Sequence, residues 1–164
     1  MKSLLIDGLA FPDQKGAMIM EEWKDIPGYE GLYQASNLGQ IRTCEGKITS
    51  NARFGIRVWK QRILKPKRAA NKKGRIDLRV ELWKDGKHKT LLVSRLVAFT
   101  WCEGYKDGWT VNHKNGNQLD NRAENLEWLS HGDNIRHGFA NGLYPQACFM
   151  SDYSYKDAPI GGVV

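Results

Sequence analysis

Residues 76–82 carry the pattern that most restricts how this chain can fold, because apolar and charged side chains alternate there without a break. The apolar members are Ile76, Leu78, Val80 and Leu82. A period of two predicts a strand with one buried face. Asp85 and Gly86 then supply the residues of a tight turn, so the chain is expected to return as an antiparallel strand over 88–93.

A second structural unit is predicted further along the chain, where two short strands enclose a long loop. Residues 109–113 and 126–129 have the composition of strands, and the stretch between them, 114–125, is polar and loop-like. A helix is expected directly after the second strand. The spacing therefore predicts a strand–loop–strand–helix unit, in which the helix folds back across the two strands.

Helix ends can also be read from the sequence. Ser94 is a plausible N-cap for a short helix that follows the first hairpin. Ser130 or Asp133 is suited to cap the second helix, which runs to about Asn141, and Gly142 is well placed to end it. The predicted fold class is α+β, with small mixed β hairpins and one strand–loop–strand–helix motif.

The length of 164 residues leaves room for one modest domain, or for one small domain with an accessory module. Residues 1–19 lack a clean period and are expected to form a flexible leader. We expect a β-rich region over 20–93, a domain containing the second structural unit over 94–143, and an irregular C-terminal tail over 144–164.

Targeting and redox signals indicate the compartment. There is no stretch of about 18 apolar residues and no signal-peptide pattern, so no membrane partner is expected. The three cysteines, Cys44, Cys102 and Cys148, are widely spaced and odd in number. Because such cysteines fit neither a disulfide framework nor a thiolate zinc site, a soluble cytoplasmic protein is the expectation.

Positive charge is concentrated in residues 52–75, which hold ten Lys or Arg and no acid, against a net charge of +7 for the whole chain. Such a segment is either a solvated basic loop or a contact for a nucleic-acid backbone. Interleaved aromatic and apolar side chains favour an ordered binding surface. The candidate contacts are Arg53, Arg57, Lys60, Arg62, Lys65, Lys67, Arg68, Lys72, Lys73 and Arg75, together with Arg79 of the hairpin.

Two polar clusters come together if the second helix folds back across the strands. They are VNHKNGN at 111–117 and HGDNIRH at 131–137. A neutral imidazole at His113 could take a proton from water, and the amide oxygens of Asn112 and Asn134 suit a hard divalent ion. The spacing alone leaves a structural reading open, because a histidine at a strand end is more often simply hydrogen-bonded.

Three other residues complete the candidate site. Asn125 can donate to and accept from the backbone across the long loop, which would fix the hairpin that aims His113. His137 lies three residues after Asn134 on a neighbouring part of the helical face, where it could approach the metal or the phosphate, or merely cap a polar surface. His131 precedes this helix and is expected to be structural or exposed.

The stretch VNHKNGNQLDNRAENLEWLSHGDNIRH closely resembles the motif of the HNH endonucleases, with His113, Asn125 and Asn134 at the three name-giving positions. Upstream, WKDIPGYEGLYQASNLGQIR is similar to the NUMOD-type segment of phage and intron-encoded homing endonucleases, and SRLVAFTW is similar to the helix that leads into the motif. The resemblance covers roughly residues 21–143.

This resemblance implies a ββα-metal fold, one divalent ion, Mg²⁺ or Mn²⁺, and hydrolysis of double-stranded DNA. It assigns His113 as general base, Asn134 as metal ligand and Asn125 as the asparagine that braces the loop. Arg95 matches an arginine of the leading helix and is a candidate phosphate contact. With one site, the protein is expected to nick DNA or cut it in steps, and a monomer is favoured because no coiled-coil repeat argues for a dimer.

The chain also departs from the family pattern. The residue before the base is commonly Asp in the homing enzymes and is Asn112 here, and Ser94 stands where a histidine often precedes the arginine. A neutral amide attracts a metal less strongly than a carboxylate does. The alternative function is therefore a sequence-specific DNA-binding protein that keeps the HNH scaffold without cleaving.

Overall fold

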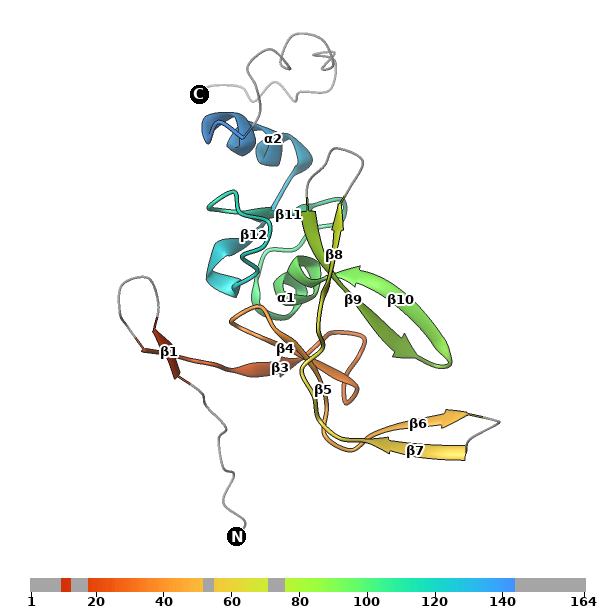
Figure 1. Ribbon diagram of the computed structural model, residues 1–164. Coiled ribbons are helices and arrows are strands. Elements are labelled where there is room, and N and C mark those ends of the chain that lie inside the picture. The colour runs from red at the N-terminus through yellow and green to blue at the C-terminus, as the bar shows by residue number, and fades with distance from the viewer. Residues whose placement is uncertain (1–9, 13–17, 52–54, 71–75, 144–164) are drawn as a thin grey trace.

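A computed structural model describes residues 10–12, 18–51, 55–70 and 76–143, in which short strands pair into five small antiparallel sheets accompanied by two α-helices. Figure 1 shows the second helix at one end of the molecule and the first at the centre, among the sheets. The α+β class predicted from the sequence is confirmed.

The N-terminal part consists of three small sheets. The strands β1 (Ala10–Pro12) and β2 (Met18–Met20) pair within the stretch where the sequence showed no clean period. A three-stranded sheet follows in the order β3-β4-β5, and a two-stranded hairpin, β6–β7, extends away from it (Figure 1). Their bounds are β3 Trp23–Asp25, β4 Tyr33–Ser36, β5 Ile41–Thr43, β6 Lys47–Asn51 and β7 Gly55–Trp59.

The alternating segment forms the long strand β9 (Ile76–Lys84), which pairs with β10 (Lys87–Leu92) as the sequence predicted. Asp85 and Gly86 form the turn with φ values of 52° and 71°. Positive φ at both central residues gives the turn a twist that matches the flanking strands. The strand β8 (Lys67–Ala70) pairs with the other edge of β9, so the sheet has the order β10-β9-β8.

The helix α1 (Val93–Trp101) begins directly after β10. The prediction that Ser94 caps it is wrong: Leu92 is at the N-cap position and makes no side-chain hydrogen bond there. The helix starts two residues earlier than a Ser94 cap would require, with Val93 buried in the core, so Ser94 falls within the first turn.

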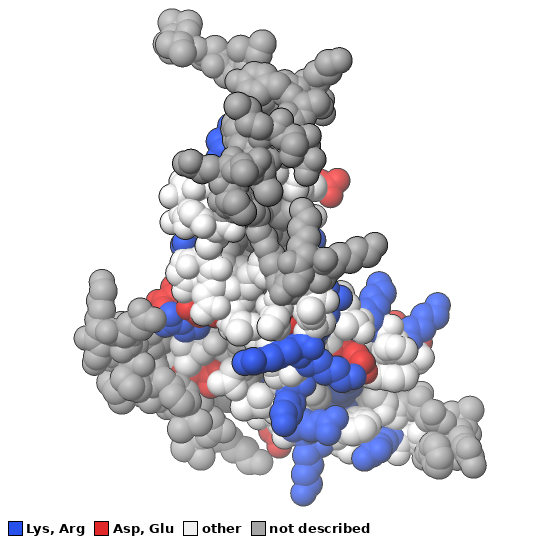
Figure 2. All heavy atoms as spheres, turned by 45° about the horizontal axis from the view of Figure 1, so that its top comes forward, with Lys and Arg blue, Asp and Glu red and all other residues white. Residues whose placement is uncertain are grey.

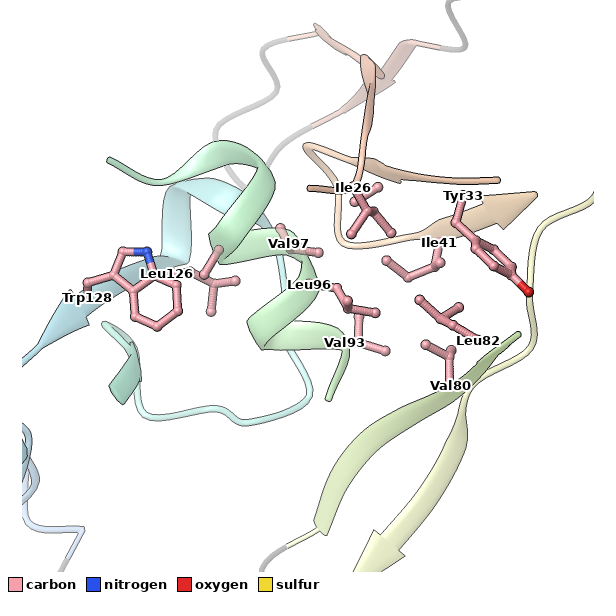
Figure 3. Close-up of a cluster of buried hydrophobic side chains, with 12 residues drawn as sticks. Ile26, Tyr33, Ile41, Val80, Leu82, Val93, Leu96, Val97, Leu126 and Trp128 are labelled. Carbon is pink, nitrogen blue, oxygen red and sulfur yellow. The ribbon is translucent and has the colours of Figure 1, made fainter. Parts of the chain in front are cut away.

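One cluster of buried side chains surrounds α1, as Figure 3 shows. Val93, Leu96 and Val97 of the helix lie between two groups of side chains. On one side are Leu126 and Trp128; on the other are the apolar residues of the N-terminal sheet and of β9, namely Ile26, Tyr33, Ile41, Val80 and Leu82. The core therefore continues across residue 93, where the sequence suggested a domain boundary, and the division into two domains stays a prediction.

The second structural unit has the predicted order. The strands β11 (Thr110–His113) and β12 (Leu126–Leu129) are antiparallel, with the 3₁₀ turn η1 (Ala123–Asn125) just before β12 and the helix α2 (His131–Ala140) after it. These elements form a ββα unit.

Both ends of α2 match the expectation from the sequence. Of the two predicted caps, Ser130 holds the N-cap position, and its Oγ accepts a hydrogen bond from the backbone N–H of Asp133 at 3.1 Å. Gly142 has φ 65°, and the N–H of Leu143 donates to the carbonyl of Gly138 at 2.8 Å, which closes the helix. Neither helix in the described ranges is long and apolar enough to cross a membrane.

Candidate active site

The register of the β11–β12 hairpin divides the site residues between two faces. Asn112 lies opposite Glu127, and His113 lies opposite Leu126. Side chains alternate across a strand, so Asn112 shares a face with Thr110, whereas His113 shares the other face with Val111. Nδ2 of Asn134, on α2, donates to Oγ1 of Thr110 at 3.1 Å. The helix therefore covers the Asn112 face.

His113 ends β11 and is half-buried beside the long loop. Its Nε2 lies 3.1 Å from Oδ1 of Asn121, within hydrogen-bond distance. Burial lowers the pKa of the imidazole, and the hydrogen bond to Asn121 and the charge of Asp120 oppose this effect only in part. A histidine with a pKa below 6.5 is neutral at pH 7, which is the form that can accept a proton from water.

Asn125 ties the two ends of the long loop together. Its Oδ1 accepts from the backbone N–H of Asn115 at 3.0 Å, and its Nδ2 donates to the carbonyl of Asp120 at 2.8 Å. The backbone adds a bond from the N–H of Lys114 to the carbonyl of Asn125, also at 2.8 Å. These are the contacts that the predicted brace requires, and their effect on a reaction stays a prediction.

The two candidate metal ligands are oriented alike. Nδ2 of Asn112 donates to Oε1 of Glu127 at 2.8 Å, just as Nδ2 of Asn134 donates to Thr110. With each nitrogen held by the protein, the amide oxygens of the two side chains are the atoms free to ligate. Within the described ranges no group of three or more His, Cys, Asp or Glu could hold a metal. The donor set of amide oxygens with one nearby carboxylate fits a hard ion that keeps several waters.

The histidines of α2 differ in their surroundings. His137 is half-buried, and its Nδ1 is buried with no hydrogen-bond partner among the residues the structure describes. His131 is exposed at the first position of the helix, as expected. No hydrogen bond between described residues joins the His137 ring to Asn134 or to His113, so a role for His137 rests on its free ring nitrogen.

Two residues of the site were not foreseen from the sequence. Glu127 fixes the orientation of Asn112, and the cross-strand register of the hairpin is the signal that could have revealed it. Asn121 contacts His113 from the middle of the loop, where the sequence offered no signal beyond a run of polar residues.

The basic residues gather on one part of the surface, where Figure 2 shows Lys and Arg in clusters with few acids among them. A groove of about 320 Å³ runs beside β8 and β9. The cations lining it are Arg62, Lys65, Lys67 and Arg79, and Glu81 adds one acid. Lys67 pairs with Glu81 at 2.8 Å. A groove of this kind can accommodate a phosphate backbone.

The remaining nucleic-acid candidates are more scattered. The guanidinium of Arg57 stacks on the ring of Trp59 at 3.9 Å, and that of Arg95 lies 5.5 Å from the ring centre of Phe99 on α1. Lys60 and Arg68 are exposed. Four further candidates, Arg53, Lys72, Lys73 and Arg75, lie outside the described residues.

Comparison with known proteins identifies two motifs, one after the other along the chain. A NUMOD4 motif matches residues 21–79, and an HNH endonuclease motif matches residues 97–136. The first therefore runs from just before β3 to the middle of β9, and the second spans the end of α1, the β11–β12 hairpin and most of α2.

Curated proteins are also similar to this chain in sequence. The DNA endonuclease I-HmuI of Bacillus phage SP01 is 39% identical over 121 residues, which is 74% of this chain and 59% of that protein. The uncharacterized HNH endonuclease L247 of Acanthamoeba polyphaga mimivirus is 36% identical over 130 residues, or 75% of this chain and 27% of that protein. The chain thus spans less than two thirds of the length of either relative.

A solved structure also matches, described as DNA binding and cleavage by the HNH homing endonuclease I-HmuI. The TM-score is 0.56 at 37% sequence identity, over 77% of this chain and 63% of that one. The likeness therefore extends from the sequence to the arrangement of the sheets and helices.

Proposed function

The chain belongs to the HNH endonucleases that carry an N-terminal NUMOD4 motif, and from this we propose that it is a metal-dependent DNA endonuclease of the phage homing type. It would hydrolyse phosphodiester bonds in double-stranded DNA, and the cytoplasm is the proposed place of action. The observation that carries the proposal is the end of β11, where the half-buried imidazole of His113 directly follows Asn112, whose amide is held by Glu127.

His113 is proposed as the general base. Burial lowers the pKa of its imidazole, which favours the neutral form that can take the proton of the attacking water. The loop hydrogen bonds of Asn125 hold the strand end that presents His113. His137 is proposed to contact the scissile phosphate through its half-buried ring.

Asn112 and Asn134 are proposed to hold one divalent ion, Mg²⁺ or Mn²⁺, through their amide oxygens. When bound, such an ion polarises the phosphate and stabilises the charge on the leaving oxygen. Glu127 and Thr110 accept the amide hydrogens and so leave both amide oxygens available to an ion. These two hydrogen bonds orient the side chains of Asn112 and Asn134 before an ion binds.

DNA binding is proposed to use the basic groove and the cations around it. Arg62, Lys65 and Arg79 line the groove beside β8 and β9. Arg95 of α1 is proposed as a further phosphate contact. Because these contacts are to the backbone, they would set affinity and salt dependence more than sequence preference.

A monomer with a single ββα site acts on one strand at a time, so nicking is the expected primary product. The test is incubation of the purified chain with supercoiled plasmid in Mg²⁺, in Mn²⁺ and in EDTA. Relaxed plasmid that forms only with metal supports the proposal, and linear plasmid appearing later would indicate sequential nicks or two protomers. A plasmid that carries a known cognate site and is bound but never cut would instead support a DNA-binding protein without cleavage.

A further inference from the structure

We propose that Asn121 is a positioning residue that fixes the tautomer and the orientation of His113, and that the turn around Gly39 in the NUMOD4 segment holds Asn121 in place. The inference rests on the proposed role of His113 as the base. It would make the geometry of the reaction depend on the N-terminal region as well as on the ββα unit.

The contact between the two side chains determines which ring nitrogen carries the proton. Oδ1 of Asn121 lies 3.1 Å from Nε2 of His113, and an amide oxygen can only accept a hydrogen bond. Nε2 must therefore carry the hydrogen when the imidazole is neutral. Nδ1 is then the nitrogen with a free lone pair, so it is the atom able to accept a proton from water.

The burial of Asn121 indicates a purpose beyond loop stability. The residue is 5% exposed, and its Nδ2 is buried with no hydrogen-bond partner in the part of the chain the structure describes. Leaving an amide N–H unpaired in the interior costs free energy, so a purely structural residue here would pair both ends of the amide or be apolar. Its one paired atom is the oxygen directed at His113.

The chain is held by hydrogen bonds on both sides of Asn121. On one side, Nδ2 of Asn125 donates to the carbonyl of Asp120 at 2.8 Å. On the other, the N–H of Ala123 donates to the carbonyl of Asn37 at 2.8 Å, which links the loop to the N-terminal region. Neither bond involves the side chain of Asn121, which leaves that side chain available to His113.

Gly39 packs directly on the peptide group of Asn121. A Cβ at this glycine would lie 2.8 Å from both the carbonyl carbon and the carbonyl oxygen of Asn121, closer than such atoms approach in real structures. Gly39 also has φ +87°, a conformation that other residues adopt only with strain. A larger residue at position 39 must therefore displace the Asn121 peptide or the turn itself.

The direct test is the tautomer of His113 in solution. Long-range ¹H–¹⁵N spectra of the ¹⁵N-labelled full chain at about pH 8 distinguish Nε2–H from Nδ1–H, and His113→Ala assigns the signal among the four histidines. We expect Nε2–H in the wild type and in Asn121→Asp, which keeps an oxygen acceptor. In Asn121→Leu, which has no acceptor, a mixture of tautomers is expected.

Two results would overturn the inference. A wild-type signal from the Nδ1–H tautomer would exclude the proposed hydrogen bond, and it needs no variant to fold. An unchanged tautomer in Asn121→Leu, with the other three histidine signals also unchanged, would show that Asn121 does not select it.

Single-turnover cleavage tests the consequence for the reaction. Asn121→Leu and Gly39→Ala are expected to slow the cleavage step about 10- to 100-fold, while DNA affinity stays within about twofold, because misplacing a base affects the reaction more than binding. A proportional loss of affinity and rate would instead indicate general damage and contradict positioning. If the tautomer behaves as expected and the wild type cuts no DNA, the proposed function fails and the orientation by Asn121 stands.

Discussion

Asn112 and Glu127 face each other across the β11–β12 hairpin, and the amide of Asn112 donates to the carboxylate of Glu127 at 2.8 Å. Asn112 is 5% exposed, so its side of this hydrogen bond is buried in the protein. The position that is commonly Asp in related homing enzymes is thus a neutral donor here, with a negative charge directly opposite. A charge placed at position 112 would meet that of Glu127.

The first prediction concerns that pair. In EDTA, Asn112→Asp should lower the free energy of unfolding by about 1 to 3 kcal/mol, because the hydrogen bond is lost and two carboxylates face each other. The same variant should bind Mg²⁺ roughly tenfold more tightly, since ligand charge is one of the quantities that tune affinity. Thermal melts in EDTA and titration calorimetry with Mg²⁺ measure both effects.

The matched control is Asn112→Asp combined with Glu127→Gln, which restores a neutral partner. Stability in EDTA should recover in the double variant. If Asn112→Asp alone left both the melting temperature and the Mg²⁺ affinity unchanged, position 112 would not be part of a metal site.

A second prediction tests the core that joins the two halves of the fold. Leu82 on β9 is 0% exposed in the cluster around α1, so Leu82→Ala should destabilise the chain by about 2 to 5 kcal/mol through the cavity it leaves. Ile76→Ala is the control, because Ile76 lies on the same strand and is 43% exposed. Urea unfolding of both variants measures the difference. Equal losses would argue against a buried Leu82.

A third prediction concerns acid stability. Arg122 donates to both carboxylate oxygens of Asp120 at 2.9 Å, and these hydrogen bonds lower the pKa of Asp120 below its usual value. The folded state then binds the proton less readily than the unfolded state does. Stability from this group is therefore complete above about pH 5 and is lost as the pH falls through about 3.9 toward the lower folded-state pKa.

Comparison of the wild type with Asp120→Asn isolates this contribution. The difference in unfolding free energy should be largest near pH 6 and shrink steadily below pH 4, as measured by urea unfolding across that range. A difference that grows as the solution becomes more acidic would reverse the sign and contradict the lowered pKa.

A fourth prediction addresses the basic surface. Replacing Lys65, Lys67 and Arg68 together with Ala should weaken DNA binding and reduce the slope of log affinity against log salt by about 2 to 3, since each phosphate contact contributes about 0.9. Lys67 should contribute least of the three, because it already pairs with Glu81. Salt-dependent fluorescence anisotropy measures the slope, with Lys106→Ala as a control for the loss of charge. An unchanged slope would exclude this surface from the DNA contact.

Local sequence patterns were sufficient for several elements of the fold. The hairpin of β9 and β10 follows from strict alternation and an Asp-Gly turn, and the caps of α2 follow from Ser130 and Gly142. The pairing of β8 with β9 was not predicted, because Lys67–Ala70 has no alternating pattern and is a strand only through its partner. Ser94 failed as a cap because burial of Val93 determined where α1 begins.

The residues of the candidate site also fall into those that the sequence identified and those that it did not. His113 and Asn125 were identified from spacing and from the resemblance to a known motif, and the loop hydrogen bonds of Asn125 are as expected. Glu127 and Asn121 were missed because their importance depends on contacts. Glu127 reaches Asn112 because the register of the hairpin places the two residues opposite each other. Asn121 reaches His113 because of the path of a twelve-residue loop, which the spacing of residues in the sequence does not determine.

The most direct test of the account is the single-turnover cleavage rate of His113→Ala on supercoiled plasmid in Mg²⁺, with DNA affinity measured on the same preparation. If His113 is the base, the rate should fall about 10²- to 10⁴-fold while the affinity remains close to that of the wild type. Cleavage at the wild-type rate by the folded variant would remove His113 from the base role and contradict the proposed mechanism.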